Sequence, residues 1–336
     1  MKKFWLGLLL VSLLLSGCGQ TEKHTGAAPA VKNPAAAGTY LTVVSSLGLE
    51  RTRVLAQAFA DQTGIIVQLE ELPAEPLSLR LQFLSTQPAD IWLGGTAEEY
   101  YQADKQRYLQ SYQAAGTATL PAELKDRSNR WTPVAVDYLA LLTNRDKARR
   151  LHIPVLNNLA ELTQPVLYKD IVMARPENGG AGFSFITTVW QWWGKEQALE
   201  YAGRIRTQEV AYVLSDAEAA LAVYQGQKTV AVLPLSYARA LHREHRELAA
   251  LPLQDCNGAK IIGAALLKSA PHPAAAGQFV DFLLSPAGQK LVTDGGLIAP
   301  GAPLLAGGEA IPLVHKDLAW TGTYKTEIIN TWLNAR

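Results

Sequence analysis

Hydrophobic positions along the chain alternate between two patterns from residue 40 onward. Short aliphatic runs, such as Tyr40–Val44 and Ala89–Leu93, are typical of buried strands. Between them, apolar residues recur at helical spacing, as in Leu49–Gln62, and Gly64 follows at the position where helices commonly end. Strands that alternate with helices in this way predict parallel sheets covered by helices on both faces.

The same alternation continues toward the C-terminus. Further strands are predicted at Ile65–Leu69, Lys169–Ala174 and Val230–Leu235, and further helices at Leu77–Leu84, from Ala97 onward, and at Phe183–Trp193, Asp216–Gln225, Arg239–Leu248 and Ala274–Leu284. The tail, residues 306–336, contains Trp320, Tyr324 and Trp332 and is predicted to pack on the outside as helix and turn.

The first 38 residues follow a different pattern. After Met1-Lys2-Lys3 comes an apolar run that is too short for a bilayer span but typical of a secretory signal. The run ends in Leu-Ser-Gly-Cys18, which resembles a bacterial lipobox and predicts a lipoprotein signal peptide at residues 1–17. Acylated Cys18 would anchor the mature protein to a membrane outside the cytoplasm, and residues 18–38, rich in Ala, Gly and Pro, would form a flexible spacer. An ordinary signal peptide is the alternative.

Composition narrows the choice of partners. The remaining body of about 300 residues predicts about two domains. A net charge of +1 gives no reason to expect nucleic acid as a partner. Cys256 is the one cysteine besides Cys18, so no disulfide within the chain is available, and its polar surroundings indicate a structural or incidental thiol.

Five stretches, spread in order over the body, carry a specific resemblance. They read AFADQTGIIVQ, PADIWLGGTAEEYYQA, RWTPVAVDYLALLTN, YKDIVMARPENGGAGFSF and PHPAAAGQFVDFLLSPAGQKLVTDGGLIAPG. Together they resemble the ferric-iron, phosphonate and sugar-phosphate branch of the solute-binding proteins that serve bacterial ABC importers. Members differ in what they bind, so the resemblance indicates the family more than the ligand.

The resemblance implies the type II periplasmic binding protein fold, an α/β arrangement of two doubly wound lobes with a ligand cleft between them. Lobe one would comprise residues 39–136 and 259–305, and residues 137–258 would form lobe two and the two crossover strands. The crossings would lie near Arg130–Val134 and Leu253–Ala259. The protein would be a monomer that hands its solute to an ABC permease in the membrane.

Candidate ligand-binding residues lie in loops that follow predicted strands, where ligands of doubly wound sheets bind and helix starts offer free N–H groups. They are Ser45, Ser46, Gly95, Thr96, Asn178, Gly179, Gly180, Ala181, Ser215, Ser236 and Tyr237. For each loop an ordinary structural role, as a helix N-cap or a turn, is equally open. Arg145 and Arg175 could pair with an anion, but we expect both to be ordinary surface arginines. Arg175 is the better candidate of the two because it adjoins the glycine-rich loop.

The same family resemblance allows a test for iron. Ferric-binding members carry two adjacent tyrosines after the strand that corresponds to Val230–Leu235, where this chain has Ser236-Tyr237. A serine hydroxyl does not replace a phenolate as a ligand for a hard cation. The tyrosine pair Tyr100-Tyr101 lies within a predicted helix, where neighbouring side chains diverge, so packing roles are expected.

The favoured function is therefore capture of a small anionic solute, a phosphonate or sugar phosphate, by lobe closure. A ferric-binding protein, a ligand sensor for a membrane signalling system and, in another class, a secreted hydrolase remain alternatives. The run His242, Glu244, His245 and Glu247 has a spacing compatible with metal but is expected to be a solvated helix face. We predict no catalytic residues, no metal and no cofactor, because none of the common catalytic motifs is present.

The lipid anchor leads to the first test. Replacing Cys18 by Ser removes the thiol that would carry the lipid, so the variant should stay unacylated. Cells expressing the wild type or the variant would be labelled with radioactive palmitate. Equal incorporation into both proteins would exclude Cys18 as the anchor.

Overall fold

A computed structural model describes residues 40–72 and 77–335 of the 336-residue chain. The predicted signal peptide, the lipidation site at Cys18 and the spacer lie outside the described residues. Within the described part, no helix is long and apolar enough to cross a membrane.

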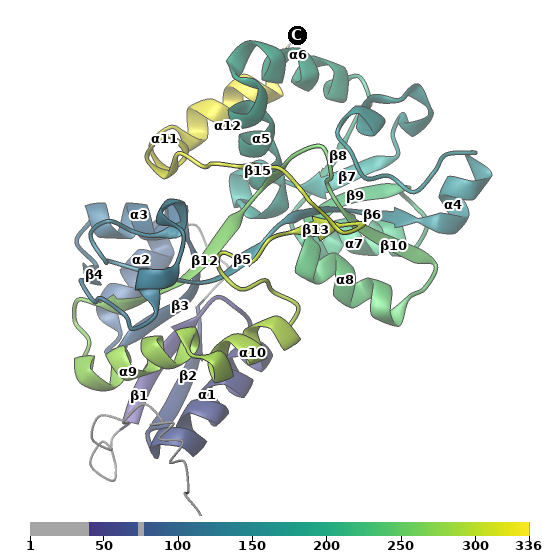
Figure 1. The fold of residues 1–336 in the computed structure, drawn as a ribbon. Helices are drawn as coiled ribbons and strands as arrows, with labels where there is room; N and C mark the ends of the chain where they lie inside the picture. Colours follow the sequence, from purple (N-terminus) through teal and green to yellow (C-terminus); the bar gives the residue numbers. More distant parts are fainter. Residues whose placement is uncertain (1–39, 73–76, 336) are drawn as a thin grey trace, which may run out of the picture. The chain divides into compact units, whose positions relative to one another are not determined.

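The first sheet is mixed, and its strands come from separate parts of the chain (Figure 1). The strand order is β2-β1-β3-β12-β4, and β5 also pairs with β12. The strands are β1 (Tyr40–Ser45), β2 (Ile66–Glu71), β3 (Ile91–Thr96), β4 (Leu109–Gln110), β5 (Thr132–Asp137) and β12 (Lys260–Leu267). β1 runs parallel to β2 and β3, whereas β12 runs antiparallel to its neighbours.

Helices cover both faces of this sheet because successive strand residues point to opposite sides. Val43 packs with Phe59 and Phe279, while Val44 packs with Trp92 and Tyr100 on the other face. The helices are α1 (Leu49–Thr63), α2 (Leu77–Thr86), α3 (Ala97–Lys105), α9 (Pro273–Leu284) and α10 (Pro286–Asp294). Gly64 ends α1 in the left-handed conformation (φ 75°), as its position in the sequence predicts.

The second sheet has the order β10-β6-β9-β7-β8. Its strands are β6 (Leu139–Asn144), β7 (Ile171–Ala174), β8 (Ala211–Val213), β9 (Val230–Pro234) and β10 (Leu248–Pro252). Its helices are α4 (Arg145–Arg150), α5 (Gly180–Trp193), α6 (Lys195–Arg206), α7 (Asp216–Tyr224) and α8 (Leu235–Glu244). α5 and α6 pack against one face, and α7 and α8 against the other. Two doubly wound lobes, as predicted, therefore share the chain.

The chain crosses between the two sheets twice. The first crossing is at Tyr138, where β5 of the first sheet leads directly into β6 of the second. It lies a few residues after the predicted Arg130–Val134, because β5 stays paired with β12 up to Asp137. The return runs from β10 through Leu253–Ala259 to β12 and contains the short strand β11 (Asn257–Gly258).

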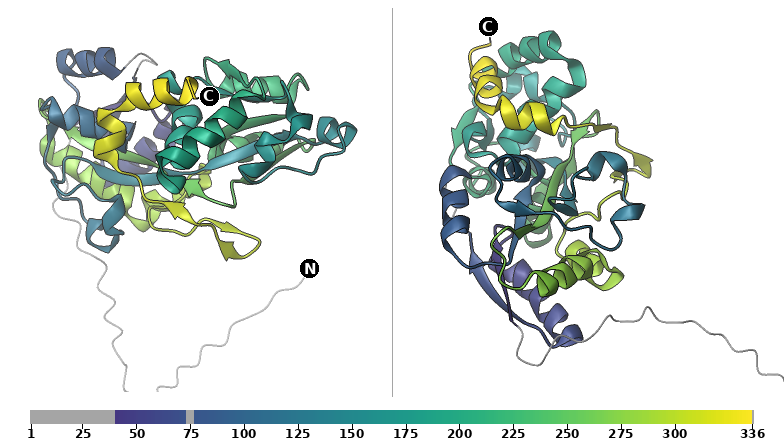
Figure 2. Two further views of the ribbon diagram at one scale, coloured as in Figure 1. Left: turned by 90° about the horizontal axis from the view of Figure 1, so that it is seen from above. Right: turned by 90° about the vertical axis from the view of Figure 1, so that its left-hand side faces the viewer.

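Two stretches differ from expectation. The helix predicted at Arg239–Leu248 begins and ends four residues earlier, because Leu248 starts β10 and pairs with Asn144 of β6. The tail contains strands as well as helices: β13 (Leu305–Ala306), β14 (Glu309–Ala310), β15 (Leu313–Val314), α11 (Leu318–Thr323) and α12 (Lys325–Leu333). Figure 2 shows α11 and α12 following one another along the molecule.

The tail does not merely lie on the outside. Trp332 is 2% exposed and packs against Phe185 and Tyr201 of the second lobe, with ring centroids 6.1 and 6.3 Å away. Ile328 and Ile329 are buried beside it. The ring of Trp332 is therefore part of the core of the second lobe. The local sequence of the tail does not indicate this burial.

Burial of Trp332 generates the second prediction. Replacing Trp332 by Ala should lower the free energy of unfolding by about 3–5 kcal/mol, the range for removing a buried large aromatic side chain. Trp192→Ala is the matched control, because Trp192 is 42% exposed and its loss should change stability by no more than about 0.5 kcal/mol. Urea denaturation of both variants measures the difference, and equal stability would show that the tail does not contribute to the core.

Candidate functional site

A small cavity lies where the crossovers meet the start of α5. It has a volume of about 10 Å³, roughly the room for one water molecule. Its walls are formed by Asp137, Tyr138, Leu139, Gly180, Ala181, Ser184, Pro234, Gly258 and Lys260. Residues from both crossovers, β9 and α5 therefore converge at one point.

The start of α5 is built by two glycines with positive φ angles. Gly179 has φ 79° and Gly180 has φ 62°, conformations that other residues adopt only with strain. The helix has no side-chain N-cap, and the N–H groups of Gly180 and Gly182 have no protein acceptor in the described part of the chain. The N–H of Ala181 donates to Asp216 Oδ1 at 3.4 Å. Free N–H groups at the positive end of a helix suit an electron-rich ligand atom.

Charged side chains surround the cavity. Asp137 and Lys260 are opposite each other in the β5–β12 register, and Asp216 reaches the start of α5 from α7. Burial raises the pKa of both Asp137 and Asp216, and the positive charge of Lys260 partly opposes each shift. Lys260 has no carboxylate within 4.0 Å among the residues that the structure describes. The site therefore offers a cation and two acceptors side by side.

Ser236 and Tyr237 have different roles here. The Ser236 N–H and hydroxyl both donate to the Asp137 carboxylate, at 3.0 and 2.6 Å, so this serine joins α8 to the first crossover. Tyr237 is partly exposed, and burial together with the charge of Asp216 raises the pKa of its phenol. Of the pair, only Tyr237 presents its side chain free of a hydrogen bond within the described protein.

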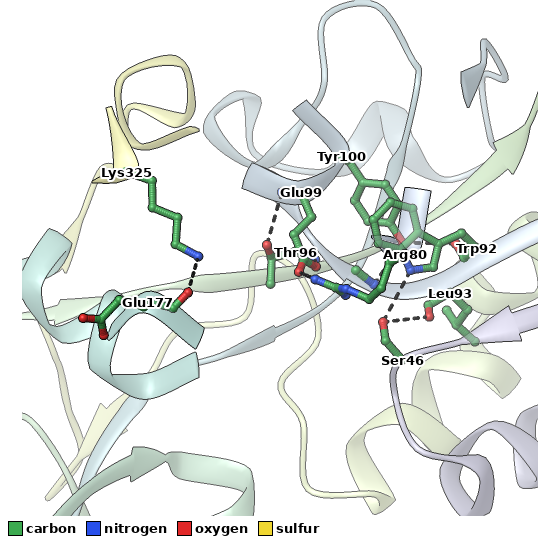
Figure 3. Close-up of polar contacts among 10 residues, drawn as sticks. Ser46, Arg80, Trp92, Leu93, Thr96, Glu99, Tyr100, Glu177 and Lys325 are labelled. Carbon is green, nitrogen blue, oxygen red and sulfur yellow. Dashed lines mark hydrogen bonds and ion pairs between the residues drawn. The ribbon is translucent and has the colours of Figure 1, made fainter. Parts of the chain in front are cut away.

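The two candidates in the loop after β1 also diverge. Ser45 is fully buried, and its hydroxyl bonds Thr52 Oγ1 at 2.7 Å and accepts from the Leu47 N–H at 3.0 Å. It stabilises the entry into α1. Ser46 is exposed, and its hydroxyl makes long contacts of 3.4 Å with the Leu93 carbonyl and the Trp92 indole N–H (Figure 3).

The loop after β3 is committed to local structure. Thr96 and Glu99 form a reciprocal capping box at the start of α3, shown in Figure 3. The Gly95 N–H donates to the Tyr100 hydroxyl, which also bonds the carbonyl oxygens of Trp92 and Gly263. Tyr100 is fully buried, as expected for a packing role.

The remaining candidates border the start of α5 or face solvent. The Asn178 amide donates to the Leu214 carbonyl at 2.9 Å, and Ser215 caps α7 next to Asp216. Arg145 and Arg175 are exposed side chains. Of the candidates, the structure places Gly180 and Ala181 in the cavity wall, with Gly179 next to them in the chain and Ser215 next to Asp216, and it leaves their contact with a ligand a prediction.

Two residues of the cavity wall, Asp137 and Lys260, were missed by sequence reasoning. Asp216 is not part of the wall; it follows the candidate Ser215 in a loop that the sequence indicates, and it reaches the start of α5 from α7. Asp137 and Lys260 lie 123 positions apart in chain order and meet only through strand pairing. The sequence did offer one indication: Asp137 and Lys260 each lie close to one of the two predicted crossings between the lobes.

Other groups with potential chemistry have structural surroundings. Cys256 is buried, and burial raises the pKa of its thiol to about 12, which disfavours the reactive thiolate. His245 lies 3.6 Å from Glu247, and His242 contacts the Leu248 carbonyl. No group of three potential metal ligands occurs among the described residues.

The two lobes and the double crossover define the fold class of type II periplasmic binding proteins. The sequence profile of bacterial extracellular solute-binding proteins matches residues 41–298, and the chain belongs to this family. Its members are binding proteins and not enzymes, so the alternative of a secreted hydrolase is set aside. A relative from Haemophilus influenzae, described as an uncharacterized protein, is 25% identical over 211 residues, which is 60% of each chain.

Solved structures share the fold at low sequence identity. The periplasmic binding protein AfuA from Actinobacillus pleuropneumoniae, with fructose-6-phosphate bound, is 21% identical with a TM-score of 0.76 over 89% of this chain and 98% of its own. Iron-bound HitA from Pseudomonas aeruginosa is 20% identical, with a TM-score of 0.70 over 88% of this chain and 99% of its own. Since one fold carries these different ligands, the fold does not identify the solute.

The buried Asp137 generates the third prediction. Because its folded pKa is raised, the folded state holds the proton more tightly than the unfolded state, and this residue's contribution to stability falls as pH rises above about 3.9. The side chain of the Asp137→Asn variant cannot ionise. Between pH 4 and pH 7 the free energy of unfolding of the variant should therefore increase relative to that of the wild type. Urea denaturation across this range measures the difference, and a parallel dependence would contradict the raised pKa.

Proposed function

We propose that this protein captures a small solute carrying both an anionic group and hydroxyl groups, with a sugar phosphate favoured over a simple phosphonate. The observation that carries the proposal is the juxtaposition of the α5 start with the ammonium of Lys260, which has no carboxylate within 4.0 Å among the described residues. Free N–H groups and an ammonium attract an anion, whereas Asp216 and Asp137 are suited to accept hydrogen bonds from hydroxyl groups. A plain phosphonate would add no donor to either carboxylate: Asp137 already accepts from Tyr138 and Ser236, whereas Asp216 accepts only from the Ala181 N–H, at 3.4 Å, among the described residues.

Ferric ion is the second candidate, supported by the likeness to iron-bound HitA. The chemistry of the donor set argues against it. Ser236 takes the position of a second tyrosine, and its hydroxyl is engaged by Asp137. Of the two positions Ser236 and Tyr237, only Tyr237 carries a phenol, and one phenolate with a nearby lysine is a weak set for a hard trivalent cation.

The cellular role follows from the family and from the first residues of the chain. We infer a protein tethered outside the cytoplasm through acylated Cys18, acting as a monomer that delivers its solute to an ABC permease. The spacer of residues 18–38 would let the lobes reach that permease. A sensor that reports the same solute to a membrane signalling system is the alternative partner.

The ligand class leads to the fourth prediction. A ligand at about 100-fold excess over its Kd should add about 2.7 kcal/mol to the free energy of unfolding by mass action. Thermal shifts would be measured with fructose 6-phosphate, methylphosphonate, fructose and ferric citrate. We expect the largest shift with the sugar phosphate. A shift with the ferric complex alone, abolished by Tyr237→Phe, would establish the iron function instead.

A further inference from the structure

The tail connects to both lobes through a segment that we call the C-terminal strap, residues Lys316–Leu333. On the first lobe, Lys316 pairs with Glu98 at 3.4 Å, and the Gln102 amide donates to the Gly322 carbonyl. On the second lobe, α12 packs against α5 and α6. The strap therefore passes close to the start of α5, where the candidate site lies.

Lys325, the first residue of α12, points into this region. Its Nζ donates to the Glu177 carbonyl at 3.1 Å and lies 5.2 Å from the centre of the Phe183 ring. A Cβ placed on Gly179 would lie 4.0 Å from the same nitrogen. An ammonium carries three donors, and one of them is used by Glu177. The other two have no acceptor in the described part of the protein, and the ammonium lies beside Gly179.

The charge on Lys325 is incompletely balanced. The side chain is partly buried, yet no carboxylate lies within 4.0 Å of its nitrogen in the described part of the protein. Burial lowers the pKa of the Lys325 ammonium, and nearby carboxylates, Glu99 first among them, oppose that shift. A partly buried ammonium without a paired carboxylate is stabilised when an anion binds beside it.

The first lobe presents a second cation in the same view. Figure 3 shows Lys325 pointing from α12 toward Glu177, with Thr96, Glu99 and Arg80 of the first lobe beside them. Arg80 is ion-paired with Glu99, and its side chain is 13% exposed. The Arg80 Nε is buried and has no hydrogen-bond partner among residues 40–72 and 77–335. A buried donor without an acceptor is unfavourable, so a ligand acceptor there would stabilise it.

The two glycines that open α5 have neighbours of opposite charge. A Cβ on Gly180 would lie 3.2 Å from the Asp216 carboxylate, whereas one on Gly179 would lie 4.0 Å from the Lys325 nitrogen. A phosphoryl group on the Gly180 side would meet Lys260 but also the Asp216 carboxylate. On the Gly179 side it would meet the Lys325 ammonium, which has no carboxylate within 4.0 Å in the described part of the protein. The charges thus orient a solute that has one anionic end and one hydroxylated end.

We propose that Lys325 is a ligand-binding residue, supplied by the C-terminal strap, whose ammonium contacts the phosphoryl group of the solute on the Gly179 side of the α5 start. The hydroxyl groups of the solute then face Asp216. The inference rests on the proposed function and adds to it the residue and the orientation that determine specificity. It also assigns the strap a role in binding in addition to its role in packing.

The test compares Lys325→Gln with the wild type by isothermal titration calorimetry, with fructose 6-phosphate and methylphosphonate as probes. Loss of a charge-assisted hydrogen bond should weaken binding of fructose 6-phosphate roughly 10- to 100-fold. Any binding of methylphosphonate should weaken by a similar factor, because the two probes share the phosphoryl group. Lys325→Arg, which keeps the charge, should retain most of the affinity.

Lys195→Gln is the matched control, because Lys195 is also the first residue of a helix of the second lobe and its side chain is exposed. Its affinities should equal those of the wild type. The melting temperature of each protein without ligand separates a binding role from a structural one. If Lys325→Gln binds with unchanged affinity, whether or not its melting temperature is lower, the binding role of Lys325 is excluded. The proposed function is not affected by that result.

The result with the wild type keeps the two proposals distinct. If the wild type binds neither phosphorylated probe, the proposed function fails and the assignment of Lys325 fails with it. If the wild type binds fructose 6-phosphate and Lys325→Gln binds it equally well, the proposed function stands and the strap is a structural brace. Should Lys325→Gln not fold, Lys325→Met and Lys325→Arg take its place in the same comparison.

Discussion

A single buried amide joins the two crossovers on which both lobes depend. Asn257 of the second crossover accepts from the Leu139 N–H at 2.8 Å and donates to the Leu139 carbonyl at 2.7 Å, next to the first crossover. The Asn257 side chain thus forms with the backbone of Leu139 the pair of hydrogen bonds that a neighbouring strand would otherwise form. Asn257 is fully buried, and an unpaired amide there would cost about 1–3 kcal/mol, so both bonds restrict where the chain can pass between the sheets.

The candidate site is a consequence of the same junction. Asp137 ends β5 and accepts three hydrogen bonds, from the Tyr138 N–H and from the N–H and hydroxyl of Ser236. These bonds hold the start of α8 beside the first crossover. Lys260 begins the strand that pairs with Asp137, so the second crossover delivers a positive charge to the same point. Neither the Asp137 carboxylate nor the Lys260 ammonium is fully exposed to solvent, so each charge depends on its neighbours for stabilisation.

Several candidate side chains serve the scaffold instead of offering free donors. Ser45 stabilises the entry to α1, Thr96 caps α3 and Ser236 holds α8 to Asp137. Their hydroxyl groups are used because helix starts need acceptors for their N–H groups and buried carboxylates need donors. The start of α5 differs, since Gly179 supplies no side chain and leaves N–H groups free. That contrast is what makes this helix start the centre of the proposed site.

The alternation of strands and helices was predictable from the sequence because each element has its own hydrophobic period, and Gly64 ended α1 where its position indicated. The glycine pair at Gly179 and Gly180 was also predictable, because few other residues adopt its backbone conformation. The shift of α8 and the burial of Trp332 were not, since strand pairing and packing between distant segments override local pattern. Likewise, only tertiary structure places Lys260, Asp216 and Lys325 around one helix start, because charges that meet across distant parts of the chain leave no periodic signal in it.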